Sequence, residues 1–403
     1  MKQFSTVSFF ILSLALIACG NKNKSNQSYP DKTRTISVES DNRLPSWAFG
    51  GFVRPEGANP VIRPDTTSVF NCPMRKKTIG WEESDTFNPA AIAKDGKIYV
   101  LYRAEDNSAV GIGKRTSRIG LAESVDGVTM KRRPAPVMYP DEDNAKEYEW
   151  EGGCEDPRIA VTEDGTYIMA YTAWNRKVPR LSIATSKDLV TWKKHGPAFA
   201  DAYGGRFKDM ACKSGSIVTG LDGDRQVITK VNGKYLMYWG EKAVCAAVSE
   251  DLVSWEPVLD ENNELKILIK PRKGYFDSAL TECGPPAILT KNGILLLYNG
   301  KNRNDDEGRD KRFNAGAYCA GQVLFDLREP YKAIERLDVP FFRPVEAFEK
   351  SGQYVDGTVF IEGLAYLHKK WYLYYGCADS EVGMAIYDPD NPAKADKIPA
   401  VSH

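Results

Sequence analysis

Short apolar runs separated by polar turn residues recur along the chain. Alternation of this kind around DG, NG or KK turns is typical of β-hairpins. Five segments show it: 91–103, 159–174, 226–239, 287–300 and 364–376. A further apolar run follows each of them and predicts a third strand, at 118–127, 180–192, 243–255, 316–327 and 382–389. The second and third of these runs share the pattern A-x-S-x-D-L-V-x-W.

The spacing of the hairpins predicts the fold. Their turn positions, Gly96, Gly165, Gly233, Gly293 and Lys370, are separated by 69, 68, 60 and 77 residues, which suits one antiparallel sheet per unit. We therefore expect an all-β protein, a five-bladed β-propeller, whose radial repetition leaves short edges and a central channel. A two-sheet sandwich is the alternative, although its turn signals usually come every ~8–12 residues.

The first residues predict export. Residues 1–18 combine an early lysine with an apolar run and read as a signal peptide. The tetrapeptide Leu16-Ile17-Ala18-Cys19 looks like a bacterial lipobox, which implies a lipid on Cys19, an ordinary secretory peptide being the alternative. Residues 19–44 are polar and are expected to form a flexible tether, with 45–403 as a single folded domain. No acidic run follows Cys19, so we expect the periplasmic side of the outer membrane.

Composition narrows the choice of ligand. Lysine plus arginine equals aspartate plus glutamate, at 54 each, which argues against nucleic acid and against membrane contact other than through the lipid. Besides Cys19, seven cysteines occur without a CxxC spacing, and we expect mostly buried free thiols. With only three histidines, neither a metal site nor a cofactor is expected. The sequence does not specify an oligomeric state.

Polar residues recur where the hairpins begin and where their second strands end. In a propeller such positions converge on the mouth of the channel, and several carboxylates beside aromatic rings suit a sugar site. Singly, Asn88 or Asp156 beside a proline reads equally well as a turn, and Glu241 as a surface residue. Recurrence favours a site. The residues are Asn88, Glu155, Asp156, Glu282 and Glu362 at hairpin starts, Arg103, Glu241 and Asp379 at strand ends, and the aromatic Trp150, Tyr238, Trp239 and Tyr375. The charged segment 302–353 is expected to be a solvated loop, with part of it capping the pocket as the alternative.

Several motifs resemble glycoside hydrolase family 130, which comprises mannoside phosphorylases and β-mannosidases on five-bladed propellers. They are FNPAAI at 87–92, the run from DGKIY to LYRA ending at 104, GCEDPRI at 153–159, YNG at 298–300 and EGLAYLHKKWYLYYGCADS at 362–380. The likeness spans about residues 45–388. It implies that Asp156 is the acid, acting through a substrate hydroxyl, and that Asn88, Arg103 and Asp379 hold a mannose ring. Further candidate substrate contacts are Glu155, Arg158, Tyr298, Asn299 and Glu362.

Two departures from the phosphorylase pattern indicate the branch. Glu282 lies in TECGPP, where many phosphorylases read G-A-G-P-P-P, and Glu241 ends YWGE, where they tend to read L-H-R-P. Two carboxylates there would repel phosphate yet suit holding a water. The pattern resembles the β-1,2-mannosidase branch.

We therefore expect an exo-acting β-mannosidase that hydrolyses β-1,2-linked mannosides of an oligosaccharide by inverting single displacement. Glu241 or Glu282 would be the base and Asp156 the acid, with a direct acid about 6.5–9.5 Å from the base carboxylate. One alternative is a phosphorylase that binds phosphate through Arg176, Lys213 or Lys242. The other is a non-catalytic glycan-binding lipoprotein.

Overall fold

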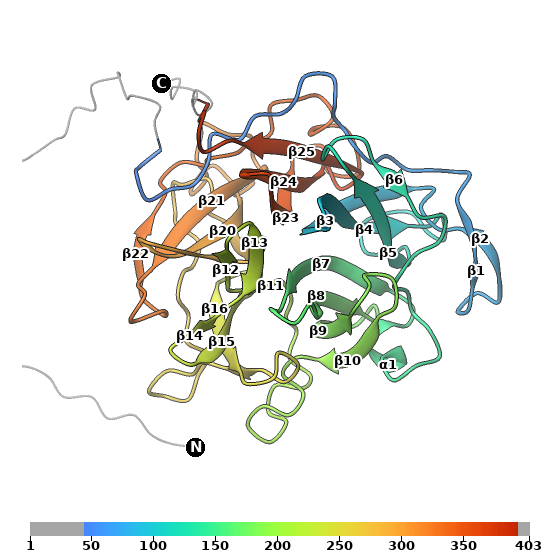
Figure 1. Ribbon diagram of the computed structural model, residues 1–403, viewed down its shortest axis with the longest axis horizontal. Helices are drawn as coiled ribbons and strands as arrows, with labels where there is room; N and C mark the ends of the chain where they lie inside the picture. Colours follow the sequence, from blue (N-terminus) through green and yellow to red (C-terminus); the bar gives the residue numbers. More distant parts are fainter. Residues whose placement is uncertain (1–43, 394–403) are drawn as a thin grey trace, which may run out of the picture. The chain divides into compact units, whose positions relative to one another are not determined.

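A computed structural model describes residues 44–393, which form an almost wholly β structure (Figure 1). Within this range the one α-helix is α1 (Lys146–Glu149), and no helix there is long and apolar enough to cross a membrane. The all-β class expected from the sequence is confirmed. The expected signal peptide, Cys19 and the tether up to residue 43 lie outside the described residues.

The first two hairpin units lie in one eight-stranded sheet. Each unit is an antiparallel series in which the first strand pairs with the second and the second with the third, as expected. One parallel pair, Ser117 with Gly153, joins the two units. Their strands are β3 (Asp85–Lys94), β4 (Lys97–Glu105), β5 (Ser117–Ser124), β6 (Lys131–Arg132), β7 (Gly153–Val161), β8 (Tyr167–Trp174), β9 (Pro179–Ser186) and β10 (Lys193–Pro197). The separate pair β1 (Val69–Cys72) and β2 (Lys77–Gly80) precedes them.

The third hairpin is only partly as expected. Residues 226–228 belong to β13 (Arg225–Ile228), which pairs with β12 (Thr219–Asp222) and not with β15 (Lys234–Trp239). β15 pairs with three strands: β11 (Gly215–Ile217), β16 (Cys245–Ser249) and the two-residue β14 (Lys230–Val231). An alternating pattern shows that a segment is a strand but does not identify its partner, so the expected 226–239 hairpin is wrong in its first half. β17 (Glu256–Pro257) completes this sheet.

The fourth and fifth hairpins form as expected, each followed by its third strand. Segment 302–353, expected to be a solvated loop, contains the third strand predicted at 316–327, whose residues 318–325 pair with the preceding hairpin, and a further strand at 333–336 that was not expected. The strands are β18 (Leu280–Cys283), β19 (Ile288–Thr290), β20 (Gly293–Lys301), β21 (Tyr318–Phe325), β22 (Ala333–Arg336), β23 (Val359–Leu367), β24 (Lys370–Cys377) and β25 (Glu381–Tyr387).

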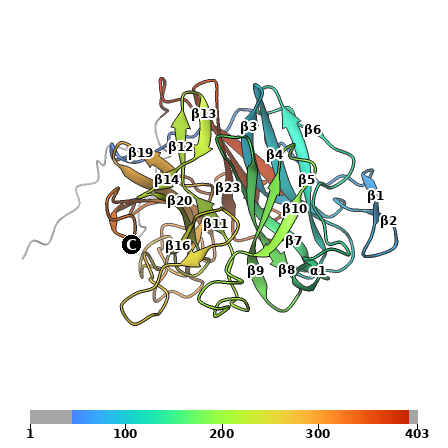
Figure 2. The ribbon, with the colours of Figure 1, turned by 60° about the horizontal axis from the view of Figure 1, so that its bottom comes forward.

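The sheets are grouped around a central region, with β3, β7, β11 and β23 on its inner side (Figures 1 and 2). β3 contacts both β7 and β23, although these three strands belong to different hairpin units. Apolar side chains from neighbouring sheets form the core between them. The central region is thus the place where residues far apart in the sequence come together.

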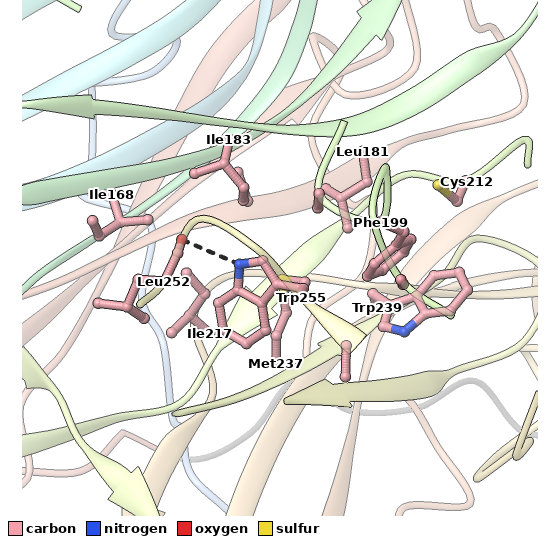
Figure 3. Close-up of a cluster of buried hydrophobic side chains, with 14 of the residues drawn as sticks. Ile168, Leu181, Ile183, Phe199, Cys212, Ile217, Met237, Trp239, Leu252 and Trp255 are labelled. Atoms are coloured by element: carbon pink, nitrogen blue, oxygen red, sulfur yellow. Dashed lines mark hydrogen bonds between the residues drawn. The ribbon is translucent and has the colours of Figure 1, made fainter. Parts of the chain in front are cut away.

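The repeated A-x-S-x-D-L-V-x-W pattern is a structural turn. Asp251 Oδ1 accepts hydrogen bonds from the backbone N–H groups of Val253 and Ser254, and the Trp255 indole N–H donates to the Leu252 carbonyl at 3.2 Å. Asp188 and Trp192 make the same contacts in the other copy. Trp255 and Leu252 then pack in the core between β9 and β15 (Figure 3). The motif therefore stabilises the turn after the third strand in the second and third units.

The cysteines of the described region agree with the sequence analysis. All seven are buried and none is paired in a disulfide. Burial raises the pKa of several of their thiols, for example that of Cys245 to about 11. These side chains behave as small apolar residues of the core.

Candidate active site

Three inner strands carry an extra residue that turns a polar side chain out of the regular pleat. The register shifts between Phe87 and Pro89 in β3, between Glu155 and Arg158 in β7, and between Ile361 and Gly363 in β23. The extra residues include Asn88 and Asp156, whose φ angles are 45° and 49°. β-Bulges of this kind re-aim side chains, often beside active sites.

The expectation that these residues precede their strands is therefore wrong. Asn88, Asp156 and Glu362 lie inside β3, β7 and β23. Pro89 and Pro157 read as strand breakers in the sequence, but a bulge tolerates proline because it interrupts the ladder of hydrogen bonds.

Arg103, in β4, is the centre of a buried ionic cluster. Its Nη2 lies 2.6 Å from Glu105 Oε1 and 2.9 Å from Glu155 Oε1, and its Nη1 lies 3.1 Å from Asp156 Oδ1. Asn88 Nδ2 donates to the same Asp156 oxygen at 2.9 Å. The structure thus brings together four of the residues proposed from the sequence and adds Glu105, which the sequence analysis missed although it lies two residues after Arg103.

The carboxyl groups of this cluster differ in their protonation. Burial raises the pKa of Glu155 to about 7, against the charge of Arg103, and raises the pKa of Asp379 to about 7 for the same reason. Burial also acts on Asp156, but the charges of Arg103, Lys213 and Arg158 outweigh it and hold its pKa below the ordinary value. Of the carboxyl groups in the pocket, Glu155 and Asp379 therefore hold a proton more readily than Asp156 does.

Glu241 and Glu282 lie beside one lysine in the same pocket. Lys213 Nζ is 3.2 Å from Glu241 Oε1 and 3.6 Å from Glu282 Oε1, and the Ser214 hydroxyl donates to Glu282. Glu282, in β18, is buried, whereas the side chain of Glu241, after β15, is 38% exposed. Burial and the charge of Glu241 raise the pKa of Glu282, and Lys213 opposes that rise.

All these groups open on one pocket of about 330 Å³. Among the proposed residues, the lining includes Asn88, Arg103, Glu155, Asp156, Glu241, Glu282 and Asp379. A larger hollow of about 470 Å³ lies among the hairpin turns near Asp95, Gly165 and His368, and it contains none of the proposed residues. Within residues 44–393 no cluster of histidine, cysteine, aspartate and glutamate is arranged to hold a metal ion.

Four proposed substrate contacts lie outside the pocket lining, and their side chains have partners within the protein. The Tyr298 hydroxyl donates to Asp277 Oδ2 at 2.6 Å, and the Asn299 amide exchanges hydrogen bonds with the backbone of Ile361. The other two, Arg158 and Glu362, form a buried ion pair with 2.9 Å between Nη1 and Oε1. A strand alternates its faces, and sequence proximity to a motif does not determine which face meets the pocket.

The aromatic residues proposed for the sugar are also placed differently. Trp239 packs against Phe199 in the core, Tyr238 donates to the Pro330 carbonyl, and Tyr375 donates to Glu349. Trp150 lies outside the pocket, with the Lys146 ammonium group over its ring. The rings that line the pocket are those of Phe87, Trp174, Tyr318, Tyr354 and Phe360. Tyr318 and Gln353 of the 302–353 segment line the pocket, and Tyr354 directly follows that segment, so its alternative role in capping the pocket is supported.

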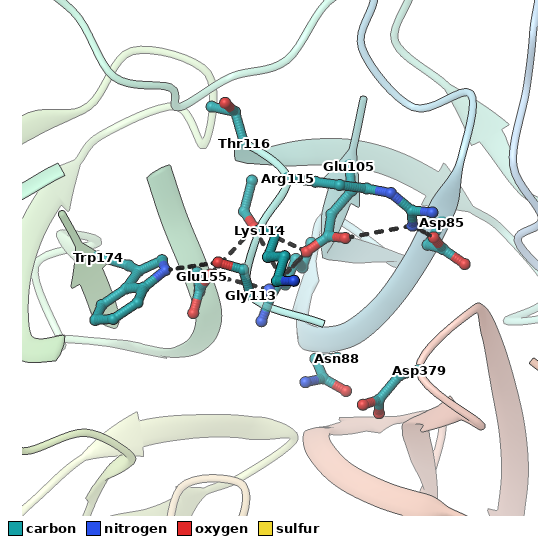
Figure 4. Close-up of polar contacts among 12 residues, drawn as sticks. Asp85, Asn88, Glu105, Gly113, Lys114, Arg115, Thr116, Glu155, Trp174 and Asp379 are labelled. Carbon is teal, nitrogen blue, oxygen red and sulfur yellow. Dashed lines mark hydrogen bonds and ion pairs between the residues drawn. The ribbon is translucent and has the colours of Figure 1, made fainter. Parts of the chain in front are cut away.

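The segment between β4 and β5 forms part of the pocket and was not singled out from the sequence. The Trp174 indole N–H donates to the Gly113 carbonyl at 3.1 Å, and Arg115 pairs with Asp85 and lies 3.7 Å from Glu105 (Figure 4). Ile112 and Gly113 line the pocket, and Ile112 is exposed. Burial raises the pKa of Asp85 to about 6. This segment is therefore tied to the Arg103 cluster by charge and to β8 by Trp174.

Comparison with known proteins identifies relatives along nearly the whole described region. The model of glycoside hydrolase family 130, described as "beta-1,4-mannooligosaccharide phosphorylase", matches residues 55–391. A 1,2-beta-oligomannan phosphorylase of Thermoanaerobacter sp. strain X514 is 34% identical over 78% of this chain and 94% of its own length. A beta-1,2-mannobiose phosphorylase of the same organism is 29% identical over 77% of this chain and 92% of its own.

Solved structures give higher identities. One is 62% identical, with a TM-score of 0.88, and the match covers 89% of this chain and 100% of that chain. It is described as "The GH130 family of mannoside phosphorylases contains glycoside hydrolases that target beta-1,2 mannosidic linkages in Candida mannan". A glycosyl hydrolase from Bacteroides ovatus is 61% identical, with a TM-score of 0.87 over 89% of this chain and 99% of that one. By its motifs, its pocket and these matches, the chain belongs to glycoside hydrolase family 130, whose members here act on β-mannosides.

Proposed function

We propose that this protein hydrolyses β-1,2-linked mannosides by a single displacement that inverts the anomeric centre. The observation that carries the proposal is the pair Glu241 and Glu282, which both lie beside Lys213 in a pocket that also holds Asp156. Two carboxylates at one site can orient and deprotonate a water, whereas a phosphate dianion would meet their negative charge. The 62% identical structure described with β-1,2-specific glycoside hydrolases supports the same reaction.

The proton for the leaving group would come from the Arg103 cluster. Asp156 is held ionised by Arg103 in the free protein, while the pKa values of Glu155 and Asp379 are raised to about 7. Glu155 and Asp156 both pair with Arg103, so a bound sugar that weakens the contact of Asp156 with Arg103 would let Asp156 take the proton that Glu155 holds. Asp156 would then pass it to the glycosidic oxygen, directly or through a sugar hydroxyl.

Unpaired polar atoms around the pocket suit a sugar ligand. Four buried atoms of lining residues have no hydrogen-bond partner among the described residues: Asn88 Oδ1, Glu105 Oε2, Thr172 Oγ1 and Gln353 Oε1. Such atoms cost free energy unless a ligand or water pairs with them. The hydroxyl groups of a mannose ring would supply donors, and the rings of Trp174 and Tyr354 offer flat faces for its C–H groups.

Phosphorolysis is the second candidate, and the names of the curated relatives favour it. The family description names a phosphorylase, and both Thermoanaerobacter relatives are named as phosphorylases. Of the three cations considered for phosphate, only Lys213 lines the pocket, and it is already paired with Glu241 and Glu282. Arg176 instead contacts Glu151 and the Lys114 carbonyl. A phosphorylase would therefore need a conformation in which Lys213 leaves its two glutamates.

The deciding experiment follows β-1,2-mannobiose in phosphate-free buffer and again with phosphate. Free mannose without phosphate, appearing first as the inverted anomer by NMR, is expected. Mannose 1-phosphate formed only with phosphate would establish the second candidate, and retention of the anomer would refute single displacement. Binding of the disaccharide without turnover under either condition would support a non-catalytic glycan-binding protein.

The architecture and location belong to the same proposal. The five hairpin units would be the five blades of a propeller, with the pocket at one end of its channel. A lipid on Cys19 would hold the protein in the outer membrane, on the periplasmic side. A Cys19→Ala variant that still fractionates with membranes and still incorporates labelled palmitate would overturn the anchoring.

A further inference from the structure

Arg158 is a buried arginine directly behind the pocket. It lies in β7, two residues after Asp156, and is 2% exposed. Its Nη1 donates to the Asp156 carbonyl at 3.0 Å, and its Nη2 donates to the Cys283 carbonyl at 2.8 Å. The same Nη1 lies 2.9 Å from Glu362 Oε1. Arg158 does not line the pocket, so its guanidinium contacts the backbone around the site and does not face the space that a substrate would fill.

The partners of Arg158 come from three strands of different hairpin units. Asp156 belongs to β7, Cys283 is the residue after Glu282 at the end of β18, and Glu362 lies in the bulge of β23. One rigid planar group thus bridges the backbone of the proposed acid and the backbone next to a proposed base. Nε adds a longer contact of 3.4 Å to the Gly284 carbonyl.

We propose that Arg158 is a positioning residue that sets the separation of Asp156 and Glu282, an inference that rests on the proposed acid and base. The bond to the Cys283 carbonyl ties β7 to β18, the bond to the Asp156 carbonyl holds the guanidinium against the bulge of β7, and Glu362 of β23 lies at ion-pair distance. A displacement of about 1 Å between reacting groups can cost about 100-fold in rate, so such a link affects turnover without touching substrate.

A lysine cannot replace this link. Its single ammonium group has no planar fork and cannot reach the Asp156 and Cys283 carbonyls in the same geometry. It would, however, keep the positive charge that acts on Asp156, Glu282 and Glu362. Arg158→Lys therefore separates the geometric role from the electrostatic one.

The matched control is Arg336→Lys. Arg336 also donates to a backbone carbonyl, that of Lys270, and pairs with a buried carboxylate, Asp277, at 2.5 Å. It lies outside the pocket lining. Both substitutions remove a guanidinium fork that holds a carbonyl and a carboxylate, and both keep the charge; the Arg336 side chain is 13% exposed, so its loss should cost somewhat less stability.

The test measures kcat, KM, the pH profile and the thermal midpoint of the full-length protein on β-1,2-mannobiose. We expect Arg158→Lys to lower kcat about 10- to 100-fold with little change in KM or in the pH limbs, and Arg336→Lys to lower only the thermal midpoint. Glu362→Gln, which weakens the hold on Nη1 alone, should lower kcat by a smaller factor.

An Arg158→Lys protein with the kcat of the parent and the thermal loss of Arg336→Lys would overturn the positioning role. Should Arg158→Lys fail to fold, an unchanged kcat in Glu362→Gln overturns it equally, and a lowered kcat at unchanged KM supports it. The proposed function fails separately, if the parent protein releases no mannose with or without phosphate.

Discussion

Replacing Lys213 by methionine tests the electrostatics of the proposed base. Lys213 Nζ lies 3.6 Å from Glu282 Oε1 and 3.2 Å from Glu241 Oε1, and its side chain is 21% exposed. Methionine has a similar length and no charge. The substitution therefore removes the cation while it leaves the Ser214 hydrogen bond to Glu282 available.

The size of the effect follows from the distance. At 3.6 Å and an effective dielectric constant of about 20, a unit charge pair interacts by about 4–5 kcal/mol, equivalent to about 3 pKa units. The pocket is open to water, which screens part of this energy, so we expect the pKa of Glu282 to rise by about 1–2 units. A carboxylate acts as a base only when it is ionised. If its pKa is higher, it becomes protonated at a higher pH, so the acidic limb of the activity profile moves to a higher pH.

The assay is the pH dependence of kcat/KM for mannose release. In Lys213→Met the acidic limb should move upward by about 1–2 pH units, and activity on that limb should fall about 10- to 100-fold. Lys213→Arg keeps the charge and should keep the limb near its original position. Lys194→Met removes another buried lysine, paired with Glu149 at 2.6 Å outside the pocket, and should lower stability without moving the limb. Identical acidic limbs in the parent and Lys213→Met would refute the reasoning.

Three further outcomes are expected. Glu282→Gln should reduce mannose release at least about 100-fold, and a nearly full rate would exclude Glu282 as the base. Tyr298→Phe should lower the free energy of unfolding in urea by about 1–2 kcal/mol, because its hydroxyl donates a hydrogen bond to Asp277. It should leave kcat and KM unchanged, and a raised KM would show that Tyr298 contacts the substrate. The folded-state pKa of Asp379 is raised to about 7, so the stability it contributes is full below the unfolded value of 3.8 and is lost as the pH rises toward about 7. Asp379→Asn should therefore raise the thermal midpoint at about pH 8 but not at about pH 4, and an equal shift at both would contradict the raised pKa.

Local chemistry explains why most of the hairpins could be predicted. A turn such as Asp95-Gly96 places its residues at φ angles of 50° and 72°, and the flanking apolar alternation determines which faces are buried. These are properties of a few neighbouring residues. The 226–228 strand failed because its partner, β12, and the partner of β15 are selected by packing between sheets.

The candidate site was predicted less evenly. Asn88, Arg103 and Asp156 were found because they lie in specific motifs, and the structure brings them into one hydrogen-bonded cluster. Trp174 and Glu105 were missed because nothing local distinguishes a strand-end tryptophan or glutamate that faces a pocket from one that faces solvent.

The sequence by itself determined the strand class, the hairpin turns, the acidic motifs and the family likeness, because each depends on residues that are neighbours in the chain. Only the tertiary structure decided whether each polar residue of a strand faces the pocket or the protein interior. Arg158 and Asp156 are two residues apart, yet Asp156 lines the pocket and Arg158 lies behind it, because a bulge lies between them and their partners come from β18 and β23. Those contacts join residues more than one hundred positions apart, and no local pattern encodes them.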